Sequence, residues 1–260
     1  MKYIIPIICL FVLFSCTKTI TPPLNDVTQL VIEGAVSDTA GPYHVHLSKT
    51  TNFYTDNVYP SVSGASVMIT DSNTNITDVL TQAASGDYVT HTITGTYGHT
   101  YLLTVALNGK TYKASSTMPQ LVKLDSVGID LEVNNNTRPI AEYQDPAAQH
   151  NYYKYSMERN GVHVKHFQTF DDRLSNGRYI RDNLDCDTGT FHRGDLVKIS
   201  LVGLDKGAFT FLNEAENIAY NNGSLAAPAT PTSNISGGCV GYFSAQTVSS
   251  KTTTFLSGEK

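Results

Sequence analysis

The first half of the chain alternates apolar and polar residues with a period of two. In residues 101–107, Tyr101, Leu103 and Val105 fall on one face and Thr104 on the other, as in a strand with one buried face. The same pattern predicts strands over residues 30–36, 43–47, 66–70, 87–94 and 111–117. Asn108-Gly109 is a type I′ hairpin signal and predicts antiparallel pairing of its flanking strands. Residues 27–120 are therefore predicted to form an immunoglobulin-like or transthyretin-like β-sandwich.

Residues 121–260 are predicted to form a second antiparallel β domain with one helix. Strands are expected over residues 125–133, 152–158, 162–170, 195–201 and 239–249, and Asn160-Gly161 predicts a hairpin. Between residues 206 and 221, apolar side chains recur with helical spacing at Ala208, Phe211 and Leu212. Asp205 can cap the start of this helix. The fold class is thus mainly β, with one amphipathic helix.

The N-terminus has the pattern of an exported protein. Lys2 precedes an apolar run over residues 3–14, which is typical of a signal peptide over residues 1–15. A membrane-spanning helix is the alternative, but it needs about 20 apolar residues, and Pro6 interrupts this run.

The run ends at Cys16. Leu13-Phe14-Ser15-Cys16 resembles the bacterial lipobox, which implies cleavage before Cys16, acylation of that cysteine with fatty acids such as palmitate, and a lipidated tether over residues 16–26. Several acyl chains anchor a protein far more firmly than one. An ordinary signal peptide that happens to be followed by cysteine is the alternative.

Composition limits the partners and the redox chemistry. The 260 residues carry a net charge of −5 without a basic cluster, which argues against a nucleic-acid partner. Two further cysteines, Cys186 and Cys239, follow the anchor. In an oxidising compartment such a pair is usually bridged, so we expect a disulfide between them. Two separate thiols are the alternative, and a zinc site fits less well because neither belongs to a Cys-x-x-Cys pair.

The sequence contains no recognisable catalytic or cofactor-binding motif. No serine lies in a Gly-x-Ser-x-Gly motif. His44 and His46 would share a strand face, but no third metal ligand is evident. Residues 71–82 begin like a calcium loop but have Ile76 at the turn glycine position. We therefore expect no catalytic residue, metal or cofactor, and we leave the ligand-binding residues unassigned. A hydrolase with residues brought together by the fold is the alternative.

Several segments resemble, in order, a family of Bacteroidota outer-membrane lipoproteins known as domain of unknown function 4249. They are residues 30–34, 62–67, 124–126, 176–180, 193–197 and the closing stretch 228–245, which includes Ser233-Asn234-Ile235-Ser236-Gly237-Gly238. Cys239 departs from the small apolar residue that such proteins more often carry. The resemblance implies a lipoprotein that accompanies TonB-dependent transporters of the outer membrane.

Two functional hypotheses of different classes follow. The first is a non-enzymatic accessory protein anchored in the outer membrane through Cys16, on its periplasmic or cell-surface face, and associated with a TonB-dependent transport system. The second is a surface lipoprotein that binds a glycan or peptide, because Tyr152, Tyr153 and Tyr155 crowd one strand and tyrosine suits binding surfaces. The same tyrosines can equally cover a sheet.

Overall fold

The computed structural model describes residues 28–51, 59–131, 137–186, 191–220 and 230–255. The chain is mainly β with one helix, as predicted. In chain order the elements are β1 (Leu30–Ser37), β2 (His44–Lys49), β3 (Ser66–Asp71), β4 (Ile76–Val79), β5 (Thr81–Ala84), β6 (Asp87–Val89), β7 (Thr100–Leu107), β8 (Lys110–Thr117), β9 (Leu124–Leu131), β10 (Thr137–Gln144), β11 (Tyr152–Arg159), β12 (Val162–His163), β13 (Gln168–Asp171), β14 (Tyr179–Asn183), β15 (Leu196–Leu204), α1 (Lys206–Tyr220) and β16 (Val240–Thr254).

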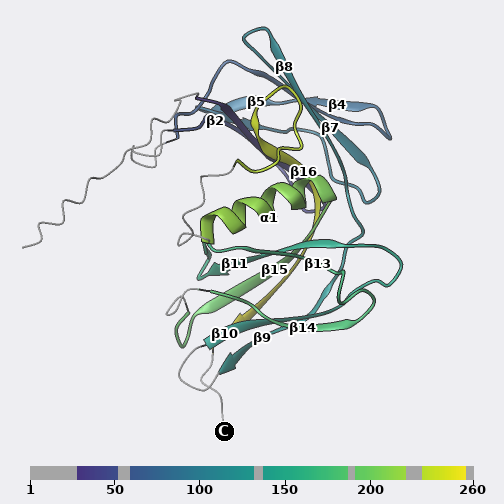
Figure 1. Cartoon of the computed structure of the whole chain (residues 1–260), viewed down its shortest axis with the longest axis vertical. Coiled ribbons are helices and arrows are strands. Elements are labelled where there is room, and N and C mark those ends of the chain that lie inside the picture. The colour runs from purple at the N-terminus through teal and green to yellow at the C-terminus, as the bar shows by residue number, and fades with distance from the viewer. Residues whose placement is uncertain (1–27, 52–58, 132–136, 187–190, 221–229, 256–260) are drawn as a thin grey trace, which may run out of the picture.

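The N-terminal part is a β-sandwich. One layer has the order β16-β1-β2-β6-β5 and the other has the order β4-β3-β7-β8, as the upper half of Figure 1 shows. The inward positions of the alternating strands, among them Ile32, Val67 and Leu103, form a single apolar core. Burial of this surface is the main stabilising contribution, at roughly 25 cal/mol per Å² of apolar area.

Both hairpins signalled by Asn-Gly are confirmed. Asn108 and Gly109 have φ values of 50° and 76°, and Asn160 and Gly161 have φ values of 52° and 80°. Positive φ at both positions is what a type I′ turn requires. The flanking strands β7 and β8, and β11 and β12, pair antiparallel.

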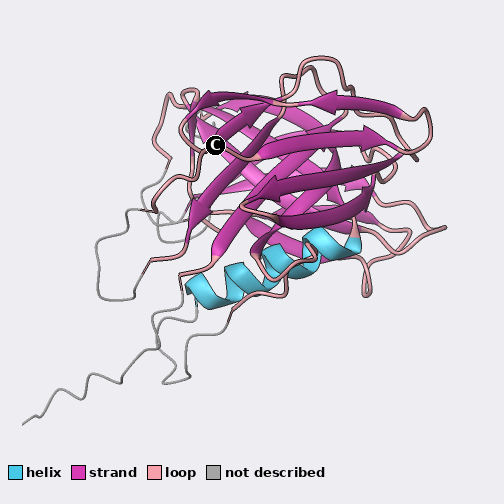
Figure 2. Cartoon of the chain, turned by 90° about the horizontal axis from the view of Figure 1, so that it is seen from above, coloured by secondary structure: helices cyan, strands magenta, loops and turns pink. Residues whose placement is uncertain are grey.

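The C-terminal part has three layers. Strands β11, β15 and β16 form the middle layer, with the sheet β14-β10-β9 on one face and α1 across the other, as Figures 1 and 2 show. Strand β15 is therefore buried on both faces: Ile199 and Leu201 point into the core beside β9 and β10, and Val202 and Leu204 point toward α1. This explains its continuous apolar run, which is typical of a strand covered on both sides.

One long strand joins the two parts. The first half of β16 pairs in parallel with β1, from Val31↔Val240 to Ser37↔Gln246. Its second half pairs antiparallel with β15, from Gly203↔Thr247 to Leu196↔Thr254. The parallel pairing of β1 with β16 was not predicted from the sequence, which indicated antiparallel strands. The expected boundary near residue 120 lies between β8 and β9, and β16 contributes to the sheets on both sides of it.

Hydrogen bonds at the junction tie the parts together. The hydroxyl of Ser116, in β8, donates to the carboxylate of Asp205 ahead of α1 and accepts the N–H of Ala245 in β16 at 2.6 Å. The N–H of Leu124 donates to Ser249 at 2.9 Å. Since these groups are partly or fully buried, they restrict motion of one part against the other.

Two predicted strands are shorter than expected. The strand expected over residues 87–94 ends at Val89, because the backbone N–H groups of His91, Thr92 and Ile93 turn toward Asp78. The segment 162–170 forms two short strands, β12 and β13, which both pair with β11. Hydrogen bonds to a side chain thus compete with the sheet ladder.

The expected disulfide is absent from the structure. Cys239 is buried in the core of the sandwich, whereas Cys186 packs against the core between β11 and β10. The two thiols therefore lie in separate cores and are not bridged. Burial raises the pKa of the Cys239 thiol to about 11, so this thiol stays protonated and unreactive near neutral pH.

The signal peptide, Cys16 and the tether lie outside the described residues. Within the described residues, no helix is long and apolar enough to cross a bilayer.

Candidate functional site

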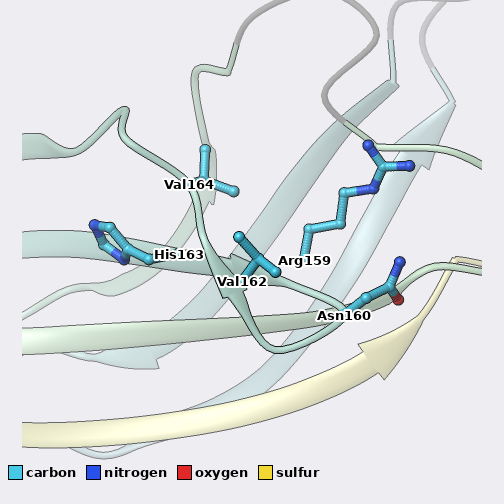
Figure 3. Close-up of a pocket in the computed structure, with 5 residues that line it drawn as sticks. All are labelled: Arg159, Asn160, Val162, His163 and Val164. Atoms are coloured by element: carbon cyan, nitrogen blue, oxygen red, sulfur yellow. The ribbon is translucent and has the colours of Figure 1, made fainter.

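A candidate binding site lies at the β11–β12 hairpin. It is an open depression of about 480 Å³ lined by Arg159, Asn160, Val162, His163 and Val164. Figure 3 shows Arg159, Val162 and Val164 directed to the same side of the hairpin and His163 directed away. The pairing of Arg159 with Val162 in the ladder explains this arrangement, because residues opposite each other and residues two apart share one face of a sheet. We call this depression the hairpin pocket.

Asp195 positions the polar rim of the hairpin pocket. Its carboxylate lies 2.6 Å from Nε of Arg159, and it accepts the side-chain amide of Asn160 and the N–H of His192, each at 2.7 Å. The pKa of Asp195 lies below its ordinary value. The hydrogen bond from the N–H of His192 contributes most to this shift, and Asn160 and Arg159 add to it. Asp195 thus stays ionised and holds the hairpin against the start of β15.

The chemistry of the hairpin pocket suits binding. Arginine recognises carboxylates, and the valines offer an aliphatic wall. The lining residues include no serine, threonine or cysteine, so among them there is no hydroxyl or thiol nucleophile. Sequence reasoning did not identify Arg159, since the only signal there is the Asn-Gly turn that follows it.

The buried carboxylates elsewhere have structural partners. Asp78 accepts the N–H groups of His91, Thr92 and Ile93 at 2.7 to 3.0 Å. Asp145 accepts the Tyr153 hydroxyl at 2.6 Å and the N–H of Gly177 at 2.9 Å. These bonds satisfy the carboxylates within the fold.

Asp205 caps α1, as predicted. It accepts the N–H groups of Gly207 and Ala208 at 2.6 and 3.0 Å, which is the usual bonding of an N-cap residue. Burial raises the pKa of Asp205 above its ordinary value, and the bonds from Ser116, Ala208 and Gly207 oppose this effect.

The histidines considered as metal ligands serve other contacts. Nδ1 of His44 lies 3.0 Å from the carboxylate of Asp87 on the neighbouring strand. His46 shares the strand face of His44 and is half-buried. Across the part of the chain that the structure describes, no three His, Cys, Asp or Glu side chains are arranged to hold a metal ion.

The turn that begins like a calcium loop is held by protein groups. Asp71 accepts the N–H of Asn73 at 2.9 Å and lies 2.8 Å from Nδ1 of His99. Burial would raise the pKa of Asp71, but the bonds from His99 and Asn73 lower it below its ordinary value.

The tyrosines of β11 belong mainly to the interior. Tyr153 and Tyr155 are fully buried between the two sheets, and burial raises the pKa of both phenols. Tyr152 lies on the opposite face, between the rings of His150 and Phe209. These tyrosines cover the sheet and do not form an open binding surface.

The fold brings together a group that the sequence did not reveal. Nε2 of His150 lies 3.5 Å from Oδ1 of Asp172 and 3.9 Å from the carboxylate of Asp171. Asp172 is buried, and this Oδ1 has no hydrogen-bond partner among the described residues. The other oxygen of Asp172 accepts the N–H of Asn151 at 2.9 Å, so this group holds the start of β11 against the end of β13.

The closing segment of the chain has a structural role. Asn234 donates its amide to the carbonyl of Phe243 at 2.8 Å and accepts the N–H of Phe243 at 3.0 Å. Ser236 exchanges backbone hydrogen bonds with Lys113 of β8. Gly241 has φ 126°, and a Cβ there would lie 1.9 Å from the carbonyl oxygen of Ile32. These residues guide β16 into its place beside β1.

The comparison with protein families gives one result. The model of the family described as domain of unknown function (DUF4249) matches residues 17–252. No curated protein matches the chain. The match covers almost all of the sandwich, the three-layer part and the closing segment, and the chain therefore belongs to the DUF4249 family.

Proposed function

We propose that this protein is a non-enzymatic, lipid-anchored accessory protein of the outer membrane, on its periplasmic or cell-surface face, and that it associates with a TonB-dependent transport system. The observation that carries the proposal is the apolar N-terminal run that ends at Cys16. The family match begins at the next residue, so the region that matches the family follows directly after the proposed lipid site.

The body supports a binding role without catalysis or cofactor. Its buried carboxylates Asp78, Asp145 and Asp205 are engaged in hydrogen bonds that hold the fold. The hairpin pocket offers a guanidinium and aliphatic side chains. A rigid β body on a lipid tether suits a protein that holds a partner near the membrane.

The association with a transporter comes from the family resemblance. Its test is affinity purification of the tagged, lipidated protein from mildly solubilised outer membranes, followed by mass spectrometry. Stoichiometric recovery of a TonB-dependent barrel supports the proposal. Recovery of the acylated protein alone contradicts the association with a transporter.

The anchor has a separate test. In the Cys16→Ala variant we expect the protein to leave the outer-membrane fraction, because about 0.8 kcal/mol per buried methylene is lost with each acyl chain. Cys186→Ala is the matched control and is expected to stay in that fraction. If Cys16→Ala fractionates like the control, Cys16 is not the anchor.

A second candidate function is a surface lipoprotein that binds a peptide or glycan. The hairpin pocket favours the peptide, because a guanidinium beside the exposed Val162 suits a carboxylate next to an aliphatic group. Saturable binding of one ligand from a peptide and glycan panel, without a barrel in the purification, would favour this function over the first.

A further inference from the structure

Three segments meet at one end of the long sheet. They are the hairpin Arg159–Val164, the turn His192–Leu196 and the end of β16, Lys251–Thr254. Arg159 pairs with Val197 and Leu196 pairs with Thr254 in the ladders, and the N–H of Gly194 donates to the carbonyl of Phe255 at 2.7 Å. We call these three segments together the distal pole.

The distal pole lies at the far end of β16 from the tether. The described chain enters the sheet at β1, whose Val31 pairs with Val240 at the beginning of β16. The distal pole contains the last residue of that strand, Thr254. A 15-residue strand spans about 45 Å at a rise of about 3.3 Å per residue. The distal pole therefore points away from the point where the tether joins the body.

The distal pole carries an excess of basic side chains. It contains three basic side chains, Arg159, Arg193 and Lys251, and one carboxylate, Asp195, in a chain with net charge −5. Asp195 already forms an ion pair with Arg159. Arg193 and Lys251 are exposed and form no ion pair with any described residue. The surface is thus locally positive on an acidic protein.

An exposed aliphatic side chain lies on the same face of the sheet as Arg159. Val162, which is 69% exposed, is paired with Arg159 in the ladder. Val162 borders the hairpin pocket on the side toward which Arg159 points, as Figure 3 shows. Asp195 contacts Nε of Arg159, and Arg159 also lines the pocket.

We propose that the distal pole is a docking site for an acidic polypeptide segment that also carries aliphatic residues. One carboxylate of the segment binds the outer edge of the Arg159 guanidinium in the hairpin pocket. An aliphatic side chain packs on Val162, and further carboxylates lie near Arg193 and Lys251. Complementary charge fixes the orientation and speeds association, while the apolar contact adds affinity.

This site rests on the second candidate function, peptide binding at the hairpin pocket, and names the class of peptide that binds there; it holds whether or not Cys16 is acylated. The test uses the full-length protein in mild detergent and a fluorescein-labelled peptide of alternating Glu and Leu, with fluorescence anisotropy as the readout. We expect saturable binding that weakens as salt is raised, because exposed charges are screened within about 8 Å at physiological ionic strength. An alternating Lys and Leu peptide is expected not to bind.

The decisive variant reverses the unpaired charges. Arg193→Glu with Lys251→Glu is expected to weaken peptide binding at least tenfold. The matched control, Lys49→Glu with Lys113→Glu, makes the same change in net charge at exposed lysines outside the distal pole, and its affinity is expected to stay within twofold. Val162→Asp, at a position too exposed to unfold the protein, is expected to weaken binding as well.

Two results would overturn the proposal. One is no saturable binding of the Glu-Leu peptide up to about 1 mM, where the binding free energy falls to about 4 kcal/mol. The other is equal affinity of the two double variants. Because Cys16→Ala tests the anchor and co-purification tests the transporter, a failure of peptide docking is distinguishable from a failure of the proposed function.

Discussion

At the scale of residues, one buried side chain takes the place of a strand partner for the backbone. Asp78 is 3% exposed and accepts three consecutive backbone N–H groups. In sequence it is one aspartate in an alternating strand, and nothing nearby predicts its partners, which lie 13 to 15 residues away. The turn after β6 therefore depends on a contact that only the folded chain creates.

Removal of the Asp78 carboxylate is expected to be costly. In Asp78→Ala three backbone N–H groups lose a buried acceptor, so we expect the free energy of unfolding in urea to fall by about 3 kcal/mol. Asp87→Ala is the control, because its ion pair with the exposed His44 contributes less than about 1 kcal/mol. If the free energy of unfolding falls equally in the two variants, the three hydrogen bonds to Asp78 contribute no more stability than the exposed ion pair of Asp87.

The same residue gives a pH dependence. Burial would raise the pKa of Asp78, but the N–H groups of Thr92, Ile93 and His91 lower it below 3.8. A lowered folded-state pKa adds stability that is present above about pH 4 and is lost as the pH falls further. As the pH is lowered below about 4, we expect the urea concentration at the unfolding midpoint of the wild type to decrease. The same decrease should be less steep in Asp78→Asn. Parallel acid profiles for the two proteins would contradict this assignment.

At the scale of elements, local signals predict local structure well. The Asn-Gly turns, the alternating strands β1, β3, β7 and β8, and the capped helix α1 appear where the sequence indicates them. Each of these elements is predicted by residues within its own segment: the turn residues, the alternation of a strand or the spacing of a helix. The partners of β16 were not predicted, since a parallel neighbour more than 200 residues away leaves no local signal.

Gly241 is the residue on which the β1–β16 pair most depends. We expect Gly241→Ala to prevent soluble folding or to destabilise the protein by more than about 4 kcal/mol, because its Cβ would overlap the carbonyl of Ile32. Gly128→Ala is the control, since a Cβ there meets nothing within 4 Å. Thermal unfolding of the two purified variants measures the difference, and a normal melting temperature for Gly241→Ala would refute the close contact.

The molecule as a whole is built around one strand that two cores share. The sandwich core and the three-layer core each contain side chains or packing partners from β16, and Ser116 joins β8 to both Asp205 and Ala245. If either part unfolds, β16 loses one of its two neighbouring strands, and the other part is destabilised. The distal pole is thus held at the end of β16 opposite to the start of β1.

We expect the protein to unfold in a single cooperative transition. Differential scanning calorimetry should give a calorimetric enthalpy equal to the van't Hoff enthalpy, although two domains were expected from the sequence. Two resolved transitions, or limited proteolysis that yields a stable fragment ending near residue 120, would show that the parts fold independently.

The sequence by itself determined the mainly β class, the two Asn-Gly hairpins and the capped helix, because each depends on residues close together in the chain. Only the tertiary structure decided that Cys186 and Cys239 lie in separate cores, that β16 pairs with both β1 and β15, and that Arg159, Asp195 and Lys251 gather at one pole. These features depend on contacts between distant segments, which are selected by the burial of both cores together and not by the preference of any one segment.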